Sequence, residues 1–454
     1  MEELPYISQV FQISSKTQII AWRNNIFCLH ELHTRFKNCV IYLTKSGLKA
    51  GDPVLLDADY TPQSVAMLLA LIQIRAIIIP LVPPSSERSP ELIEVADPTW
   101  ILTIDKNEHT SIKSRKTVFT NEYYKKLKKE HLPGLVLFTS GSTGVPKAVV
   151  HDFSKLLEKF STPRPAMRTI NFLMFDHWGG LNTLLHCLAT GSFIAFPENR
   201  TPKYICKIIE KYKIELLPST PTFLNLLLIN HSYKGYNLNH LKLITYGAEP
   251  MPQATLKRMR QVFVNTEFRQ TYGMIELGVL RAKSRSSDSL WVRIGGDGYK
   301  LRVVEGILQI KTTAAMLGYI NFPSPITEDG YFITGDRVEV DGDYMRILGR
   351  ESELINVGGE KVYPAEVETI LLEHPDVTDA IVYGLTNPIM GEIVCATISI
   401  HAKLSATEIR RKVKKHCSLK LVPFKVPVKI TVIHGPLHGD RFKRMRNQST
   451  LNNK

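Results

Sequence analysis

The sequence lacks a long, unbroken hydrophobic run. Its most apolar stretch, residues 64–82, is interrupted by Gln73, Arg75 and Pro80, so it falls short of the roughly 20 apolar residues that a membrane span requires. The N-terminus, MEELPYISQV, carries two acids and no apolar core, unlike a secretory signal or an Arg-rich transit peptide. We therefore expect a cytoplasmic protein with no membrane span, in which residues 64–82 form a buried helix and a core strand.

Cysteine is scarce and dispersed. There are six in 454 residues, with no CxxC pair and no Cys/His cluster at metal-ligand spacing, which argues against a disulfide scaffold and a zinc site. Reduced and mostly buried thiols are the expectation. The six are Cys28, Cys39, Cys187, Cys206, Cys395 and Cys417.

Positive charge is in excess. Lys and Arg number 57 against 43 Asp and Glu, a net charge of +14, although charged residues overall (22%) and hydrophobic residues (44%) are at ordinary globular levels. Disordered, collagen-like and membrane-bundle chains are therefore disfavoured. The excess charge is compatible with nucleic acid, an anionic surface or an anionic small substrate.

Short apolar runs alternate with amphipathic segments through the first half of the chain. This order predicts parallel α/β layering, in more than one sheet. The expected strands are residues 54–58, 76–81, 99–104, 134–139, 193–196 and 214–217, and the expected helices are residues 62–74, 90–96, 181–188 and 202–212.

From about Ser289 the pattern changes to short alternating segments with tight turns, which predict a small β subdomain. Asp341-Gly342 marks a hairpin, because Asp-Gly supplies the positive φ angles of a two-residue turn. After Arg350 mixed α/β patterning returns, with helices expected at 364–373 and 405–417 and strands at 378–383 and 393–400. The predicted fold class is α/β: a large N-terminal domain of layered sheets, residues 1–350, and a small mobile C-terminal α+β domain, residues 351–454.

The segment LVLFTSGSTGVPKAVVHD, residues 135–152, has the densest set of chemically useful residues. A buried strand leads into four hydroxyl residues and two glycines, followed by Pro146 and Lys147. The glycines let backbone N–H groups point inward, and the hydroxyls and Lys147 complete a phosphate cradle. No Ser or Thr follows Lys147, so a GxxxxGK[ST] loop is disfavoured. The cradle comprises Thr139, Ser140, Gly141, Ser142, Thr143 and Gly144.

TSGSTGVPK closely resembles the phosphate-loop signature of the adenylate-forming superfamily, which contains acyl-CoA synthetases, adenylation domains of nonribosomal peptide synthetases and beetle luciferase. Further segments resemble the family's motifs in the family's order. YGAEP, residues 246–250, resembles the glycine loop that lies against the adenine, which implies contacts by Gly247, Ala248 and Glu249; a strand-end turn is an equal alternative.

QTYGMIE, residues 270–276, resembles the family's YGxTE motif. The resemblance implies Tyr272 and Gly273 near the base and Glu276 on Mg²⁺, a hard cation that prefers carboxylate oxygen. Ile275 stands where the family usually has Thr. Thr334-Gly335-Asp336 resembles the TGD motif, whose carboxylate accepts the ribose hydroxyls, and Arg350 resembles the arginine that also reaches the ribose. For a lone TGD, the alternative is a β-turn.

Residues 349–368 resemble the hinge and first strand of the family's C-terminal domain, with Ser352 at the hinge position. Gly358 and Gly359 would let a pantetheine arm pass close to the backbone, although a β-bulge is an alternative. The family's C-terminal lysine is best matched by Lys443, with Arg446 three residues later.

FDHWGGL, residues 175–181, resembles the family's HxGGL segment, which implies His177 beside the carboxylate to be activated; a histidine that starts a helix is an equal alternative. Trp178, Met274 and the loop at Ala248 are expected to line the acyl pocket. Their apolar character favours a fatty or aryl acid.

The resemblance implies an acid–thiol ligase that uses ATP and Mg²⁺ to form an acyl adenylate and then passes the acyl group to CoA. The catalytic residues would be Lys443, Lys147, Glu276 and His177. One alternative is a ligase that loads the phosphopantetheine of an acyl carrier protein; others are a basic nucleic-acid-binding protein or a non-catalytic family member.

The excess positive charge is concentrated near the C-terminus. Residues 410–446 hold twelve Lys and Arg against one acid, Asp440. Such a surface suits the phosphates of ATP and CoA, or an acidic carrier protein, better than a nucleic-acid groove. We therefore expect no nucleic-acid partner.

Overall fold

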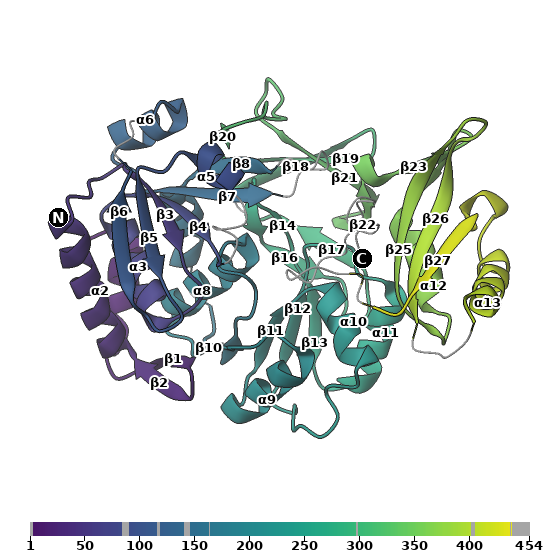
Figure 1. Ribbon diagram of the computed structural model, residues 1–454, viewed down its shortest axis with the longest axis horizontal. Coiled ribbons are helices and arrows are strands. Elements are labelled where there is room, and N and C mark those ends of the chain that lie inside the picture. Colours follow the sequence, from purple (N-terminus) through teal and green to yellow (C-terminus); the bar gives the residue numbers. More distant parts are fainter. Residues whose placement is uncertain are drawn as a thin grey trace. The chain divides into compact units, whose positions relative to one another are not determined.

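The computed structural model describes residues 3–83, 90–115, 119–139, 146–162, 164–296, 298–400, 405–435 and 437. The chain divides into two compact units, each built from separate stretches of sequence; Figure 1 labels helices and strands of both. Unit 1 comprises Met1–Pro218, Gly273–Leu280 and Lys311–Ile326, and unit 2 comprises Ser219–Tyr272, Arg281–Ile310 and Thr327–Lys454. The expected domain boundary after Arg350 lies inside unit 2 and stays a prediction.

The first sheet of unit 1 confirms the predicted parallel layering. Its four central strands, β7, β4, β3 and β5, run parallel. Strands β8 and β6 pair antiparallel with the two ends of this group, and β20 pairs antiparallel with β8. In spatial order the strands are β20 (Gly318–Tyr319), β8 (Lys147–Asp152), β7 (Gly134–Thr139), β4 (Ile77–Leu81), β3 (Pro53–Asp57), β5 (Trp100–Ile104) and β6 (Thr110–Ser114).

Helix α3 (Pro62–Gln73) supplies much of the core beside this sheet. Thr61 caps it by accepting a hydrogen bond from the Ser64 N–H at 3.0 Å, and every residue from Ser64 to Gln73 is buried. It packs against the apolar stripe of α2 (Leu29–Lys45) (Figure 1). The predicted buried helix and core strand within residues 64–82 are confirmed. Among the described residues, no helix is long and apolar enough to cross a membrane.

Where other helices of unit 1 were expected, they are present, but α8 begins three residues before the expected Leu181 and ends two residues after the expected Leu188. The other helices of unit 1 are α1 (Pro5–Phe11), α5 (Pro90–Ala96), α6 (Glu122–Lys129), α7 (Phe153–Glu158), α8 (Trp178–Thr190) and α9 (Pro202–Tyr212).

In a second group of strands in unit 1, one strand lies at a different position from the one predicted. The strand expected at residues 214–217 is β11 (Leu216–Ser219). Helix α9 ends with Lys213 in the left-handed region, and the Ile214 N–H bonds to the Ile209 carbonyl at 3.0 Å, so Ile214 belongs to the helix end. The others are β9 (Thr169–Ile170), β10 (Ile194–Phe196), β1 (Gln18–Trp22) and β2 (Asn25–Cys28).

Unit 2 contains the expected β subdomain as a six-stranded antiparallel sheet. The predicted hairpin is present, but one residue later than expected: Asp341 pairs with Tyr344, and only Gly342 takes a positive φ, +58°. In spatial order the strands are β16 (Ala282–Ser284), β17 (Trp291–Ile294), β22 (Tyr344–Arg350), β21 (Phe332–Asp341), β19 (Ile307–Thr312) and β18 (Tyr299–Val304).

Parallel strands β12 and β13 also belong to unit 2, with two helices between residues 219 and 272. These elements are β12 (Leu243–Tyr246), β13 (Glu267–Gln270), α10 (Pro221–Ile229) and α11 (Gln253–Val262). Two short strands, β14 (Tyr272–Met274) and β15 (Gly278–Leu280), pair with each other.

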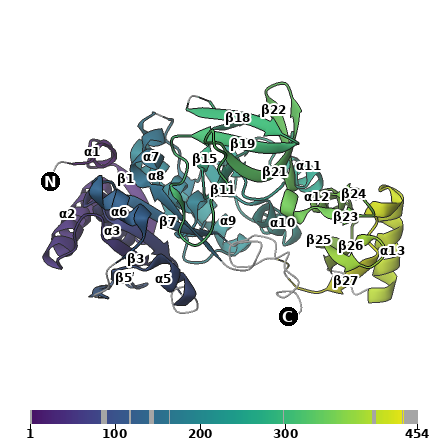
Figure 2. The ribbon, with the colours of Figure 1, turned by 90° about the horizontal axis from the view of Figure 1, so that it is seen from above.

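The C-terminal part of unit 2 is a five-stranded sheet with its own core. Helices α12 (Pro364–Leu372) and α13 (Ala406–Ser418) pack on it, and Figure 2 shows α13 at its outer side. Strand β25 runs four residues past the end of its predicted segment, and β26 begins two residues before its predicted segment and ends where expected. The strands are β24 (Glu360–Val362), β23 (Ile355–Val357), β26 (Gly391–Ile400), β25 (Val377–Asn387) and β27 (Lys429–Ile433).

All six cysteines are free thiols, as expected; five are buried and Cys28 is half-buried. Burial raises the pKa of Cys39, Cys187 and Cys206 to about 12 and that of Cys417 to about 11. Buried thiols with raised pKa values are poor nucleophiles, so these positions are structural.

Candidate active site

Three residues from separate predicted motifs meet at one carboxylate in unit 2. The Tyr272 hydroxyl donates to Asp336 Oδ2 at 2.7 Å, and Arg350 Nε lies 3.3 Å from Asp336 Oδ1. Asp336 is 9% exposed and Tyr272 7%. Burial, together with the neighbouring Asp336 carboxylate, raises the pKa of Tyr272 well above its ordinary value, so the phenol remains a neutral donor.

The backbone explains how the Thr334-Gly335-Asp336 segment holds this arrangement. It lies inside β21 instead of forming the β-turn that was the alternative, and Gly335 has φ +72°. The Thr334 hydroxyl donates to the Leu308 carbonyl at 2.7 Å, and its oxygen accepts from the Asp336 N–H at 3.0 Å. Asp336 and Arg350 are register partners on β21 and β22, which brings the carboxylate and guanidinium together.

The loop after β12 is closely packed. A Cβ on Gly247 would lie 2.3 Å from Thr271 Oγ1, so no other residue fits there without displacing Thr271. Ala248 has φ +71°, and Glu249 Oε1 accepts from the Thr222 N–H at 2.8 Å. These contacts fit a packed strand-end turn, and contact of the loop with adenine stays a prediction.

In unit 1, Glu276 and Lys147 both contact Tyr319. The Tyr319 hydroxyl donates to Glu276 Oε1 at 2.7 Å, and Lys147 Nζ lies 5.2 Å from the centre of the Tyr319 ring and 5.3 Å from that of Phe322. Position 273 has no room for a side chain, because a Cβ there would lie 2.7 Å from the Gly278 carbonyl oxygen.

The surroundings of Glu276 bear on its predicted role as a magnesium ligand, which stays a prediction. It is 7% exposed, and no group of three or more His, Cys, Asp or Glu that could hold a metal occurs among the described residues. Mg²⁺ is commonly held by one or two carboxylates plus substrate phosphates. A single buried carboxylate with a fixed orientation is consistent with that pattern.

The predicted His177 has a structural role. It precedes α8, and its Nδ1 accepts from the Gly179 N–H at 3.2 Å, which is the helix-start alternative. Trp178 is 2% exposed and part of the hydrophobic core. An additional catalytic role for His177 stays a prediction.

Gly358 and Gly359 form a two-residue hairpin turn between β23 and β24, with φ +60° and +93°. The turn accounts for both glycines, because two positive φ angles in succession favour glycine. The β-bulge considered as an alternative is wrong at this position. Whether pantetheine also passes here stays a prediction.

Some predicted site residues lie outside the described part of the chain. Thr139 ends β7 and is the register partner of Lys147, but the rest of the cradle and the C-terminal lysine cannot be placed. The undescribed residues are Ser140, Gly141, Ser142, Thr143, Gly144, Lys443 and Arg446.

Sequence reasoning missed His151, Tyr319 and Asn321. His151 is 1% exposed, and its Nε2 donates to the Ile275 carbonyl at 2.7 Å, one residue before Glu276. Asn321 joins Pro146 and Ala148, on either side of Lys147, by two hydrogen bonds. His151 lies three residues after Ala148, but the hydrogen bonds of His151, Tyr319 and Asn321 are visible only in the tertiary structure.

We expect His151 to make folding stability dependent on pH. Burial lowers its pKa from 6.5 to about 4, so the fold keeps it neutral while the unfolded chain takes up a proton below pH 6.5. The contribution of His151 to the free energy of unfolding is fully present above pH 6.5 and is lost as the pH falls toward 4. By pH 5 the free energy of unfolding should be lower by about 2 kcal/mol. Urea unfolding of the wild type and His151→Gln at pH 7.5 and pH 5 measures this difference.

The glutamine can still donate to the Ile275 carbonyl but does not titrate, so its free energy of unfolding should fall less between the two pH values. His240→Gln is the matched control, because that side chain is exposed; this variant should retain the wild-type pH dependence. Parallel pH profiles for the wild type and His151→Gln would contradict the prediction.

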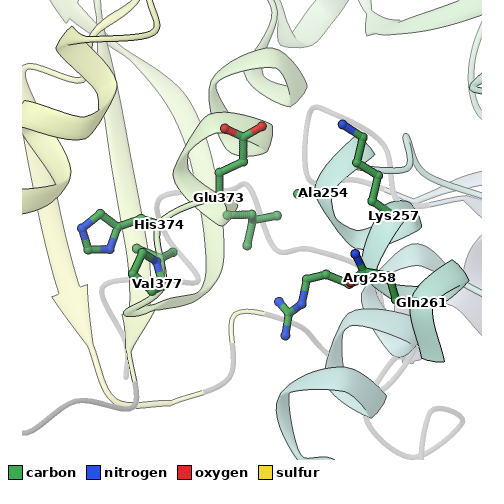
Figure 3. A pocket seen from close by; sticks show the side chains of 9 residues that line it. Ala254, Lys257, Arg258, Gln261, Glu373, His374 and Val377 are labelled. Atoms are coloured by element: carbon green, nitrogen blue, oxygen red, sulfur yellow. The ribbon is translucent and has the colours of Figure 1, made fainter.

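A cavity of about 390 Å³ lies in unit 2, away from the predicted site residues. Helix α11 contributes Lys257 and Arg258, and Figure 3 shows Glu373, His374 and Val377 on its other wall. None of the residues predicted for the site lines this cavity. We therefore assign it no role in the chemistry.

The layered sheets and the motif residues define the class of adenylate-forming, AMP-binding enzymes. The model of the AMP-binding enzyme family matches residues 15–305, well over half of the chain, and that of the AMP-binding enzyme C-terminal domain matches residues 366–437. The chain belongs to the AMP-binding enzyme family, which confirms the resemblance seen in its motifs.

Curated relatives are similar over part of their length. A 4-coumarate-CoA ligase from Narcissus pseudonarcissus is 27% identical over 324 residues, 63% of this chain and 59% of the relative. A 2-succinylbenzoate–CoA ligase from Bacillus subtilis is 27% identical over 343 residues, 69% of this chain and 68% of the relative. The chain spans about three fifths of the length of the first of these relatives.

Solved structures share the fold over almost the whole chain. An anthranilate CoA ligase, AuaEII, in complex with anthranoyl-AMP has a TM-score of 0.82 at 17% identity, covering 99% of this chain and 97% of that one. The o-succinylbenzoate CoA synthetase of Bacillus subtilis with its acyl-adenylate intermediate has a TM-score of 0.77 at 21% identity, covering 99% and 98%. The predicted α/β fold class is confirmed.

Proposed function

We propose that this chain activates a fatty or aryl carboxylic acid with ATP, releases pyrophosphate, and transfers the acyl group to the thiol of CoA. Family membership and relatives named as CoA ligases support this proposal. The observation that carries it is the meeting of Tyr272, Asp336 and Arg350, since three separate motifs converge on one buried carboxylate.

In the first step, a carboxylate oxygen of the acid attacks the α-phosphorus of ATP. The new O–P bond forms as the bond to the bridging oxygen breaks, and pyrophosphate leaves with that electron pair. Positioning and charge stabilisation dominate such a reaction. Lys147 and the cradle residues 139–144 would hold the phosphates, and Lys443 would stabilise charge near the α-phosphate.

The nucleoside would be held by unit 2. The Asp336 carboxylate and Arg350 suit the ribose hydroxyls, because a carboxylate accepts and a guanidinium donates hydrogen bonds. Tyr272 and the loop of Gly247, Ala248 and Glu249 would lie against the base. Glu276 would hold Mg²⁺, and the chemistry that the cation would supply there is neutralisation of charge developing on the phosphates.

In the second step, the thiolate sulfur attacks the acyl carbon. The carbon–oxygen bond to the phosphate breaks, AMP leaves, and the thiol proton passes to solvent. We propose that residues 351–454 form the mobile domain of the family, which withdraws Lys443 and brings Gly358 and Gly359 beside the pantetheine arm. His177 would lie near the carboxylate of the acid.

The acceptor has one specific alternative, the phosphopantetheine of an acidic carrier protein. Exposed basic residues on α13 favour it, since complementary charge steers association. These residues are Arg410, Arg411, Lys412, Lys414 and Lys415.

A pyrophosphate-release assay across fatty, aryl and amino acids tests the proposal. Fatty or aryl acids should release pyrophosphate with ATP, and mass spectrometry should detect the acyl adenylate. Added CoA should convert it to the thioester, whereas turnover only with a carrier protein would favour the alternative acceptor. If no acid in the panel causes pyrophosphate release, the proposed activity is contradicted and a non-catalytic protein is supported. Salt-sensitive DNA binding would support the nucleic-acid alternative.

A further inference from the structure

Tyr319 connects two groups that the proposed function places at the ATP phosphates. Its hydroxyl donates to Glu276 Oε1 at 2.7 Å, and its ring lies 5.2 Å from Lys147 Nζ. Tyr319 is 5% exposed and Glu276 7%. One side chain therefore contacts both a buried carboxylate and an ammonium group.

The backbone around Tyr319 is fixed to the same two segments. Tyr319 pairs with Val149 in the β20–β8 ladder, two residues beyond Lys147. Asn321 Nδ2 donates to the Pro146 carbonyl at 2.9 Å, and Asn321 Oδ1 accepts from the Ala148 N–H at 3.1 Å. The position of the Tyr319 ring relative to Lys147 is thus set by hydrogen bonds on both sides of the lysine.

The main chain near Glu276 is anchored to the same short stretch. The Met316 N–H donates to the Glu276 carbonyl at 2.8 Å. The segment from Met316 to Phe322 therefore holds Glu276 through its backbone and its carboxylate, and holds Lys147 through two aromatic rings.

We propose that Tyr319 is a positioning residue that orients the Glu276 carboxylate for the divalent cation and Lys147 for the phosphates of ATP. This inference rests on the proposed function. A hydrogen bond to Oε1 restricts rotation of the carboxylate and leaves Oε2 available for a hard cation. The rings of Tyr319 and Phe322 attract the ammonium group and limit its freedom.

The two contacts can be separated by substitution. Tyr319→Phe keeps the ring beside Lys147 and removes only the hydroxyl that contacts Glu276. Phe322→Leu removes the other ring from Lys147 and leaves the Tyr319–Glu276 hydrogen bond in place. Tyr123→Phe is the matched control, because the Tyr123 hydroxyl packs against Gly318, next to Tyr319, where a Cβ would be 2.1 Å from it.

The first readout is Mn²⁺ binding in the presence of ATP, followed by electron paramagnetic resonance. Tyr319→Phe should weaken Mn²⁺ binding by about 10-fold, the smaller end of the loss typical when an outer-shell hydrogen bond to a metal ligand is removed. Phe322→Leu should bind Mn²⁺ as the wild type does and raise the KM for ATP about threefold. Tyr123→Phe should match the wild type in both. Thermal unfolding of each variant excludes a general loss of folding.

Unchanged Mn²⁺ affinity in a folded Tyr319→Phe variant would overturn the proposal, as would an equal loss in Tyr123→Phe. Raising Mg²⁺ should restore pyrophosphate release by Tyr319→Phe, because only the affinity for the cation is reduced. If the wild type releases no pyrophosphate, the proposed function fails, while the Mn²⁺ titration still decides whether Tyr319 acts on Glu276.

Discussion

Replacing Lys443 with alanine is expected to slow acyl-adenylate formation by about 10²–10³-fold and to leave thioester formation from preformed acyl adenylate largely intact. The loss is of the size caused by removing one group that stabilises developing charge. The second half-reaction should proceed, because in the proposed mechanism the lysine is withdrawn before the thiol attacks. Single-turnover measurements of pyrophosphate release and of CoA transfer separate the two effects.

Two controls sharpen this experiment. Lys45→Ala removes an exposed positive charge in the last turn of α2, outside the basic stretch 410–446, and should leave both half-reactions unchanged. Arg444→Ala tests the register of the C-terminal motif, because it removes the neighbouring charge and keeps Lys443. Equal loss in both half-reactions for Lys443→Ala would refute the assignment, and a larger loss for Arg444→Ala would move the catalytic role to that position.

Replacing Glu276 with glutamine is expected to reduce pyrophosphate release by about 100-fold. The amide oxygen can still accept the hydrogen bond from Tyr319, so the packing is preserved while the negative charge is lost. A cation that stabilises phosphate charge contributes several kcal/mol, and about 2.7 kcal/mol corresponds to 100-fold. Steady-state rates as a function of Mg²⁺ concentration measure the loss.

Binding of ATP without Mg²⁺ should be nearly unchanged in Glu276→Gln, because the carboxylate acts through the cation. Glu267→Gln is the matched control: its carboxylate is exposed and pairs with Arg269 at 2.7 Å, so its Mg²⁺ dependence should equal that of the wild type. A Glu276→Gln variant with wild-type Mg²⁺ dependence would remove this residue from the cation site.

Much of the fold could be predicted because its periodicity is local. The strand at 134–139 and the helix at 202–212 were predicted with the observed bounds, since buried β runs and Pro-initiated amphipathic helices carry clear signals. Two boundaries were wrong because single-residue backbone conformations set them. Lys213 adopts the left-handed conformation, so β11 begins two residues later than predicted. In the β21–β22 hairpin, Gly342 alone has a positive φ, so the turn lies one residue later than predicted.

The candidate site was predictable where a motif carries its own chemistry. Asp336, Arg350 and Tyr272 were each identified by a resemblance, and the structure brings the three together. Tyr319 and His151 were not found, because their roles depend on contacts with residues 43 and 124 positions away. No periodicity or short motif in one sequence reports such a pairing.

The distribution of thiols has a practical consequence for testing the proposed domain movement in solution. Cys28 is half-buried, whereas the other five cysteines are buried, so a maleimide dye at neutral pH should attach to Cys28 first. It belongs to unit 1. One added cysteine at the exposed Ser418, the last residue of α13, would complete a donor–acceptor pair for fluorescence energy transfer measurements during each half-reaction.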